Sequence, residues 1–163
     1  MGEWIVEHIN LKLASIVDAR NLQSCALDAF EEDKRKYGSY PPNIESIEWR
    51  ESQINAGNFF LIIWQEQLVG GLCAELDSDE LVEIKYVFVA SSFQGNQIGS
   101  WVMTELEENY LNAIGFKLLT PAKSYRNQHF YEKLGYVKIS ESAAVPNNEF
   151  RAFKYVKKRN PIK

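Results

Sequence analysis

Apolar residues follow two different periods along the chain, and the shorter period predicts strands in its middle. Residues 59–64 and 68–76 are apolar runs joined by Gln65-Glu66-Gln67, a pattern typical of a β-hairpin. In residues 81–89 every second side chain falls on one face, and the second half of the segment is apolar on both faces. A strand that is covered on both sides has this pattern, so we predict that residues 81–89 form the central strand of a sheet.

Apolar residues at helical spacing predict helices before and after these strands. The helices are expected over residues 13–30, 44–55, 98–110 and 124–134. Short strands are expected over residues 4–9, 116–120, 136–139 and 150–156. The order is then a strand, two helices, three strands, a helix, a strand, a helix and two strands. This order predicts an α/β fold in which a mixed sheet has helices on both faces.

The composition is that of one folded domain. With 163 residues, of which 45% are hydrophobic and 13% aromatic, the chain is long enough to bury a core. It has no internal repeat and no linker of biased composition, so we expect a single domain over residues 1–163. No run approaches about 18 apolar residues, and the beginning has no basic and apolar segment of a secretory signal. We therefore expect no membrane contact and a cytoplasmic location.

Charge and reactive residues argue against several classes of function. The net charge of −4 and the pI near 5.3 disfavour binding of nucleic acid, which needs a basic face. The basic residues between 154 and 159 are better explained as a solvated tail. Cys25 and Cys73 lie far apart, and His8 and His129 do not have metal-ligand spacing, so we predict no metal site. The sequence also lacks a P-loop, a nucleophile elbow and a Cys/His arrangement.

A polar loop with two glycines leads from the predicted central strand into the helix that follows. Its sequence is Gln94-Gly95-Asn96-Gln97-Ile98-Gly99-Ser100. Unpaired N–H groups at a helix N-terminus, together with the helix dipole, form a binding site for anions such as phosphate. Glycine lets a phosphate approach the main chain without a Cβ atom in the way. Taken alone, two glycines in a loop more often mark an ordinary turn.

Two segments after residue 86 share a pattern with a known family. The first is Val87-Phe88-Val89 followed by the glycine-containing loop. The second is residues 127–136, which contain Phe130-Tyr131 and Gly135-Tyr136. Together they resemble the acetyl-CoA loop and the C-terminal motif of the GNAT superfamily of N-acetyltransferases, and the resemblance is clearest from residue 59 to residue 155.

The resemblance implies a fold, a cosubstrate and a set of binding residues. The fold would be a mostly antiparallel central sheet of six to seven strands with helices on both faces, and the cosubstrate acetyl-CoA (coenzyme A). Gln97 stands where the family usually has glycine, and Ser124 where it usually has asparagine, which leaves open a protein that binds acyl-CoA without catalysis. The residues implied in cofactor binding are Val87, Phe88, Val89, Gln94, Gly95, Asn96, Gln97, Ile98, Gly99, Ser100, Ser124, Asn127 and Tyr131.

Transfer of an acyl group to an amine involves the movement of two protons. The resemblance implies Tyr131 as the general acid near the thiol, whereas its apolar neighbours alone favour a core residue. Glu83 is the first candidate for the general base, and the alternative is a solvent-facing carboxylate paired with Lys85. The resemblance also implies a bulged strand at residues 87–89, whose N–H groups would stabilise the oxyanion.

The expected acceptor is a small cationic amine. In the family, the segment between the first two helices commonly helps to form the acceptor site, and here it offers carboxylates and aromatic rings that could hold a cation. The alternative is a solvated acidic helix end beside aromatic residues that pack a loop. A protein lysine or N-terminus is the rival acceptor, and edge strands permit a homodimer without requiring one. The candidate substrate-binding residues are Glu32, Tyr37, Tyr40 and Glu75, and Glu75 and Asp77 are also reserve candidates for the base.

Overall fold

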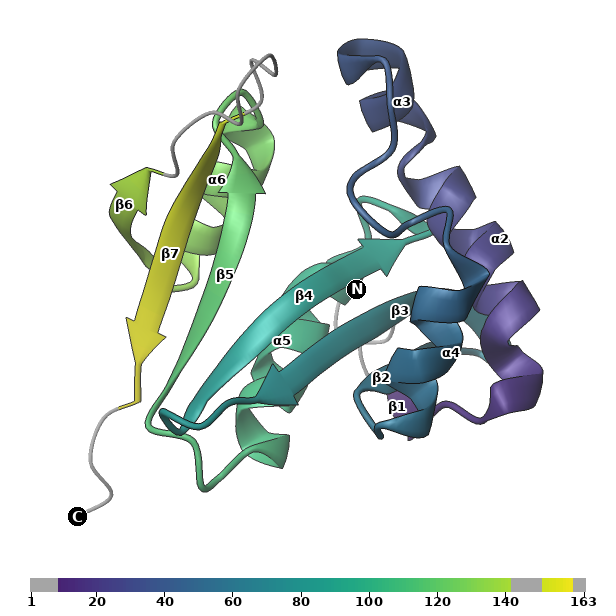
Figure 1. Cartoon of the computed structure of the whole chain (residues 1–163), viewed down its shortest axis with the longest axis horizontal. Coiled ribbons are helices and arrows are strands. Elements are labelled where there is room, and N and C mark those ends of the chain that lie inside the picture. Colours follow the sequence, from purple (N-terminus) through teal and green to yellow (C-terminus); the bar gives the residue numbers. More distant parts are fainter. Residues whose placement is uncertain (1–8, 142–150, 160–163) are drawn as a thin grey trace. The chain divides into compact units, whose positions relative to one another are not determined.

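A seven-stranded sheet runs through the part of the chain that the computed structural model describes, residues 9–141 and 151–159 (Figure 1). The hydrogen-bonded strand order is β1-β2-β3-β4-β5-β7-β6. The strands are β1 (Ile9–Leu13), β2 (Phe59–Trp64), β3 (Gln67–Leu76), β4 (Leu81–Val89), β5 (Gly115–Pro121), β6 (Val137–Glu141) and β7 (Ala152–Lys158). The helices are α2 (Ala19–Ala29), α3 (Glu31–Tyr37), α4 (Ile47–Asn55), α5 (Ile98–Asn109) and α6 (Tyr125–Lys133), with short 3₁₀ turns η1 (Ile16–Asp18) and η2 (Ser91–Phe93).

The strand pairing confirms the predicted fold class. β4 and β5 pair in parallel, whereas β1 with β2, β2 with β3, β5 with β7 and β6 with β7 pair antiparallel. β4 occupies the fourth of the seven places in the sheet, which is the central position that its pattern predicts. The chain is therefore a mixed α/β protein with a mostly antiparallel sheet and helices.

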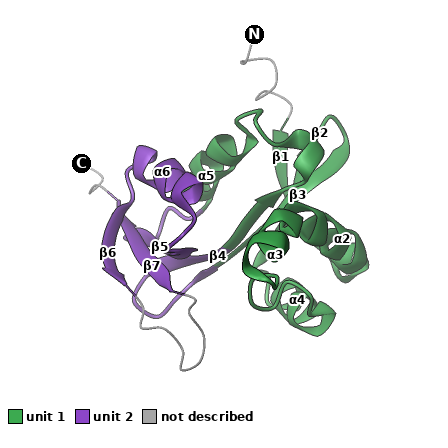
Figure 2. Cartoon of the chain, turned by 90° about the horizontal axis from the view of Figure 1, so that it is seen from above, with its two compact units in different colours: residues 1–74, 86–109 green, residues 75–85, 110–163 purple. Residues whose placement is uncertain are grey.

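The described chain divides into two compact units (Figure 2). Unit 1 comprises the described residues within Met1–Ala74 and Tyr86–Asn109, and unit 2 those within Glu75–Lys85 and Tyr110–Lys163. The boundary passes through β4, so each unit contains a part of that strand. A single domain over residues 1–163 remains our prediction.

The core of unit 1 forms where α2 and α4 pack against the sheet. Leu22 of α2, Phe59 of β2 and Phe88 of β4 are at most 4% exposed and belong to one cluster with Ile54 of α4. Complete burial of a side chain of this size contributes about 1.5–3 kcal/mol. The aromatic rings of Phe59 and Phe88 meet edge to face, with centroids 6.4 Å apart. This packing fixes the part of β4 that leads into the glycine-containing loop.

Gly70 allows β3 and β4 to approach each other closely. A Cβ atom at Gly70 would lie 2.1 Å from the carbonyl oxygen of Phe88, a main-chain atom that cannot move aside alone. Beside this contact, the N–H of Ala90 donates to the carbonyl oxygen of Val69 at 2.7 Å. Only glycine fits at position 70, because a side chain would clash with the main chain of β4. The hydrogen bond from Ala90 holds the end of β4 against β3.

The core of unit 2 lies between α6 and the strands β5 and β7. Phe116, Leu118 and Tyr155 are at most 3% exposed. The Tyr155 hydroxyl donates to Glu132 Oε2 of α6 at 2.6 Å, which fastens the helix to β7. Gly135, with a φ of 98°, follows the helix and permits the left-handed turn that was predicted to end it.

The first predicted helix is wrong in its boundaries. Residues 13–30 were expected to be one helix, but Leu13 ends β1, α2 begins only at Ala19, and α3 follows as a separate helix. Ser15 and Asp18 form a capping box, in which the N–H of Ser15 donates to Asp18 Oδ2 at 2.8 Å, so the helical turns start after Ser15. The expected strand at residues 4–9 is described only at Ile9, and residues 4–8, His8 and residue 150 lie outside the described ranges.

Candidate active site

The loop after β4 is folded against the rest of unit 1 by its own side chains. Gln94 Nε2 donates to the carbonyl oxygen of Val89 at 2.8 Å, and Asn96 Nδ2 donates to that of Phe93 at 3.1 Å. The ring of Phe93 packs edge-on against Trp64 of β2, with centroids 5.6 Å apart. These contacts give the loop a defined path from β4 to α5.

Two left-handed residues shape the turn into α5. Gly95 has a φ of 84° and Gln97 a φ of 62°, the conformation that favours glycine. Gln97 is the position at which the sequence departs from the GNAT pattern. It therefore has a backbone conformation typical of glycine, although it carries a side chain. A Cβ atom at Gly95 would point into open space, because it would meet no heavy atom within 4 Å other than those of the adjacent residues.

The first turn of α5 supplies main-chain N–H groups next to this open space. Its first i to i−4 hydrogen bond runs from the N–H of Trp101 to the carbonyl oxygen of Gln97, at 3.2 Å. The N–H groups of Ile98, Gly99 and Ser100 precede that bond, so the helix itself does not use them. The buried side chain of Ile98, 1% exposed, anchors the helix start in the core. Such a helix start can bind an anion.

Asp28 of α2 holds the beginning of the loop, and the sequence analysis missed it. The N–H of Ser91 donates to Asp28 Oδ2 at 2.7 Å, and Ser91 Oγ donates to Oδ1 at 3.0 Å. The carboxylate thus binds both donors of one residue, 63 positions away in the sequence. Because no local pattern connects such distant residues, the sequence carries no signal for this contact.

The expected acceptor residues of unit 1 surround the end of α3. The Tyr40 hydroxyl donates to Glu31 Oε2 at 2.9 Å, and this hydrogen bond raises the pKa of Tyr40. Lys34 Nζ lies 4.9 Å from the centroid of the Tyr40 ring, so this ring already has a cation beside it. Glu32 is exposed and Tyr37 is half-buried on α3. The structure therefore brings Tyr40 together with Glu31 rather than with Glu32.

Tyr131 of unit 2 lies on α6 among other aromatic residues. Its ring is half-buried and meets those of Phe130 and Tyr136 at centroid distances of 5.1 and 5.9 Å. Burial raises the pKa of Tyr131 to about 12. The hydroxyl is therefore protonated at neutral pH and can donate a proton.

The other expected residues of α6 lie around its N-terminus. Ser124 is the N-cap residue by position, but its side chain makes no capping hydrogen bond. Its carbonyl oxygen instead accepts the N–H of Gln128 at 3.1 Å. Asn127 is exposed on the first turn of the helix, and His129, two residues later, is exposed as well. The side chains of Ser124 and Asn127 are thus not used to fold the helix.

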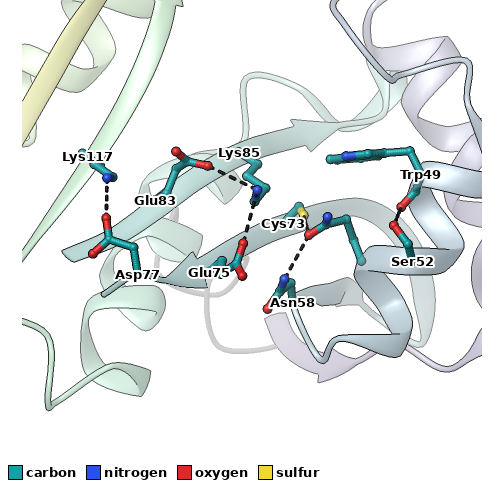
Figure 3. Close-up of polar contacts among 10 residues, drawn as sticks. Trp49, Ser52, Asn58, Cys73, Glu75, Asp77, Glu83, Lys85 and Lys117 are labelled. Atoms are coloured by element: carbon teal, nitrogen blue, oxygen red, sulfur yellow. Dashed lines mark hydrogen bonds and ion pairs between the residues drawn. The ribbon is translucent and has the colours of Figure 1, made fainter. Parts of the chain in front are cut away.

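Glu83 and Glu75 share one cation in unit 2 (Figure 3). Lys85 Nζ lies 3.3 Å from Glu83 Oε1 and 3.3 Å from Glu75 Oε2. Although burial alone would lower the pKa of Lys85, hydrogen bonds to Glu83 and Glu75 outweigh it, and the pKa is raised. The sequence left two interpretations of Glu83, a general base or a carboxylate paired with Lys85. The structure contains this ion pair.

Asp77, the reserve candidate for the base, is also paired. Its carboxylate contacts Lys117 Nζ of β5, and the hydrogen bond from Lys117 lowers the pKa of Asp77 (Figure 3). Its Oδ1 also accepts the N–H groups of Asp79 and Leu81, at 2.8 and 3.1 Å, which closes the turn between β3 and β4. These contacts explain Asp77 as a residue of the turn.

Among residues 9–141 and 151–159, no three His, Cys, Asp or Glu side chains gather as ligands of a metal ion. In the same ranges, none of the helices is both long and apolar enough to cross a membrane.

A comparison with protein families identifies residues 55–138, just over half of the chain, as an acetyltransferase (GNAT) domain. This range contains β2 to β5, the glycine-containing loop and α6. A comparison with curated protein sequences found no significant match.

Solved structures with the same fold cover nearly the whole chain at low sequence identity. The PaiA N-acetyltransferase from Thermoplasma acidophilum in complex with coenzyme A is 17% identical, covers 93% of this chain and 99% of its own, and has a TM-score of 0.75. A chimera of the spermidine N-acetyltransferase SpeG from Vibrio cholerae and hSSAT is 15% identical, with coverages of 93% and 95% and a TM-score of 0.74. A chain of the NatC complex bound to Gag peptide and CoA is 16% identical, with coverages of 94% and 99% and a TM-score of 0.71.

Proposed function

The chain belongs to the GNAT family of acetyltransferases, and on that premise we propose that it transfers the acetyl group of acetyl-CoA to the primary amine of a small cationic metabolite. The ammonium group of the acceptor first loses one proton. The neutral nitrogen then forms a bond to the acetyl carbon, the carbon–sulfur bond breaks, and the nitrogen loses a second proton while the sulfur gains one. Direct attack in a ternary complex requires that the protein bind both reactants at once. The chain's own residues must therefore hold an anionic cosubstrate, accept a proton from the amine and supply one to the sulfur.

The observation that carries this proposal is the turn from β4 into α5. Gly95 and Gln97 are left-handed, the space beside Gly95 is open, and the N–H groups of the first helical turn follow directly. These features fit the pyrophosphate of coenzyme A, which needs N–H donors and close approach to the main chain. When bound, acetyl-CoA would supply a thioester carbonyl that is reactive toward amines.

Several further residues would hold the cosubstrate in this proposal. The main chain of Val87, Phe88 and Val89 at the end of β4 would contact its acyl arm, and Gly99 and Ser100 would donate their N–H groups to phosphate oxygens. Gln94 and Asn96 would act indirectly, because their side chains hold the loop itself. Ser124 and Asn127 would contribute side chains that α6 does not use for its own fold.

Tyr131 would supply the proton for the leaving sulfur. Its hydroxyl carries a proton at neutral pH, because burial raises the pKa of Tyr131 to about 12. Its ring is held by those of Phe130 and Tyr136, which gives the hydroxyl a defined position. A phenol beside a developing thiolate can stabilise it by hydrogen bonding or by complete proton transfer.

Glu83 would accept the proton of the ammonium group. The half-buried carboxylate lies 3.3 Å from Lys85 Nζ on the same strand, and its oxygens are the groups that would receive the proton. The competing function of Glu83 is the ion pair alone. In that case the small fraction of neutral amine would react without a base once it is well positioned.

A small polyamine-like or amino-acid-like amine is the acceptor that the acidic residues favour. Glu32, Tyr37 and Tyr40 of unit 1 and Glu75 of unit 2 offer carboxylates and aromatic rings, which suit a cation. The spermidine N-acetyltransferase among the solved structures supports a small amine, and the NatC complex with its peptide supports a protein N-terminus as the rival acceptor.

The test combines a binding measurement with a turnover measurement on the full chain. Acetyl-CoA is titrated into the protein by calorimetry, and release of free thiol is then followed with spermidine, lysine and a peptide with a free N-terminus. Binding with thiol release that depends on a small amine is the expected result. Thiol release with the peptide alone would mean that the acceptor is a protein N-terminus instead of a small amine. Binding without release for every acceptor would favour a regulatory module, and absence of binding would contradict the proposed function.

A further inference from the structure

The hydroxyl of Tyr86 joins β4 to the loop between α3 and α4. It donates a hydrogen bond to the carbonyl oxygen of Pro42, a residue 44 positions away in the sequence. The Tyr86 ring meets the rings of Phe30 and Trp49 edge to face, with both centroid distances at 5.8 Å. Because the ring is packed by residues of two other segments, the hydroxyl has a defined position.

The loop around Pro42 is attached firmly on both sides of this contact. After Pro42, Ile44 is 1% exposed, and Arg50 Nη1 donates to its carbonyl oxygen at 3.2 Å. Before Pro42, the Tyr40 hydroxyl donates to Glu31 of α3 at 2.9 Å. The Tyr86 hydroxyl therefore holds the middle of a short segment, between these two attachment points.

We propose that Tyr86 is a positioning residue that fixes the loop around Pro42 relative to β4 and thereby sets the affinity for the acceptor amine. The inference rests on the proposed function, in which Tyr40 contacts the acceptor and Val87 contacts the acyl arm. Tyr86 directly precedes Val87 in β4, so one hydrogen bond connects the cofactor strand with the acceptor loop. A loop without this bond has more conformations to lose when the amine binds, which weakens binding.

The substitution Tyr86→Phe removes the hydroxyl and keeps the packed ring. We expect the KM for the amine to rise about three- to tenfold, the range of one hydrogen bond in free energy. The kcat and the KM for acetyl-CoA should stay within about twofold of wild type, because neither the acid nor the phosphate-binding turn changes. Amide hydrogen exchange of Ile44 and Ser46, which the loop hydrogen bonds protect, should become faster.

Ser52→Ala is the matched control in unit 1. It also removes one hydroxyl that donates to a main-chain carbonyl oxygen, that of Trp49 at 2.7 Å, away from Pro42 (Figure 3). It should change neither the KM for the amine nor the exchange of Ile44 and Ser46. If wild type is active and Tyr86→Phe leaves the KM for the amine unchanged, the inference is overturned. Unchanged hydrogen exchange of Ile44 and Ser46 in Tyr86→Phe also overturns the inference, and this test works even if the protein shows no amine-dependent thiol release. Absence of thiol release would contradict the proposed function, which is a separate result.

Discussion

The Tyr131 hydroxyl combines a high pKa with a half-buried position on α6. We predict that Tyr131→Phe lowers kcat about 100-fold, because the leaving sulfur loses its proton donor. The affinity for acetyl-CoA, measured by calorimetry, should stay within about twofold, since the phenyl ring keeps its contacts. Tyr125→Phe removes an exposed hydroxyl from the same helix and should leave kcat unchanged. An equal kcat in the two variants would exclude Tyr131 as the acid.

The carboxylate of Glu83 has two competing functions that one substitution can separate. If Glu83 accepts the proton of the amine, Glu83→Gln should lower kcat/KM for the amine at least about tenfold at pH 7. If it only pairs with Lys85, which also contacts Glu75, the rate should stay within about twofold. Glu80→Gln, in the exposed turn before β4, removes one negative charge and serves as the control.

Three tyrosines should titrate at unusually high pH. The pKa values of Tyr86, Tyr131 and Tyr155 are raised to about 12, in each case chiefly by burial. Between about pH 10 and about pH 12 the unfolded chain loses these protons while the folded protein keeps them, so the free energy of unfolding falls over that interval. Absorbance of tyrosinate near 295 nm, recorded with and without guanidinium, should show at least three of the eight tyrosines ionising later in the folded protein. Coincident curves would contradict this.

At the scale of elements, the turn from β4 into α5 contains a glutamine, Gln97, in a backbone conformation typical of glycine. Gln97 has a φ of 62°, which costs an ordinary residue about 1 kcal/mol. We predict that Gln97→Gly raises the free energy of unfolding in urea by about that amount. Asn96→Gly should lower it by about 0.5–1 kcal/mol, because Asn96 lacks a positive φ and its side chain bonds to Phe93. A loss of stability in Gln97→Gly would show that its side chain makes an important contact.

The elements that sequence reasoning located well are those with a strong period and a marked end. β4 has the predicted bounds because its alternating pattern is bordered by a turn and a polar loop. The first helix failed because the apolar spacing of Leu13, Ile16 and Val17 imitates a helix, although the three side chains are 45–81% exposed. The capping box of Ser15 and Asp18 was the available signal for the true start.

The candidate site was predictable only where its residues are neighbours in the sequence. The turn around Gly95 could be found because one segment contains both the glycines and the helix start. The hydrogen bonds of Asp28 to Ser91 and of Tyr86 to Pro42 join residues 63 and 44 positions apart. Such contacts depend on how α2 and the loop before α4 pack in unit 1, and no local pattern encodes them.

At the scale of the whole molecule, a net charge of −4 gives no general attraction for an anionic cosubstrate. Binding must therefore depend on local N–H donors, and a ligand that binds only the folded state stabilises it. We predict that acetyl-CoA at about 100 times its Kd stabilises the protein by about 2.7 kcal/mol, which raises Tm by about 5–10 °C.

The variant Gly95→Val tests whether this stabilisation comes from the turn before α5. Valine has a high energy at the φ of 84° found there, and its side chain fills the open space beside the helix start. The variant should have a lower Tm without ligand, and its Tm should no longer rise when acetyl-CoA is added. The comparison between wild type and variant uses only the rise in Tm that acetyl-CoA causes. The lower Tm of the variant without ligand therefore does not affect the conclusion. An unchanged response in Gly95→Val would mean that acetyl-CoA is held by other residues, and the assignment of the turn to the pyrophosphate would be wrong.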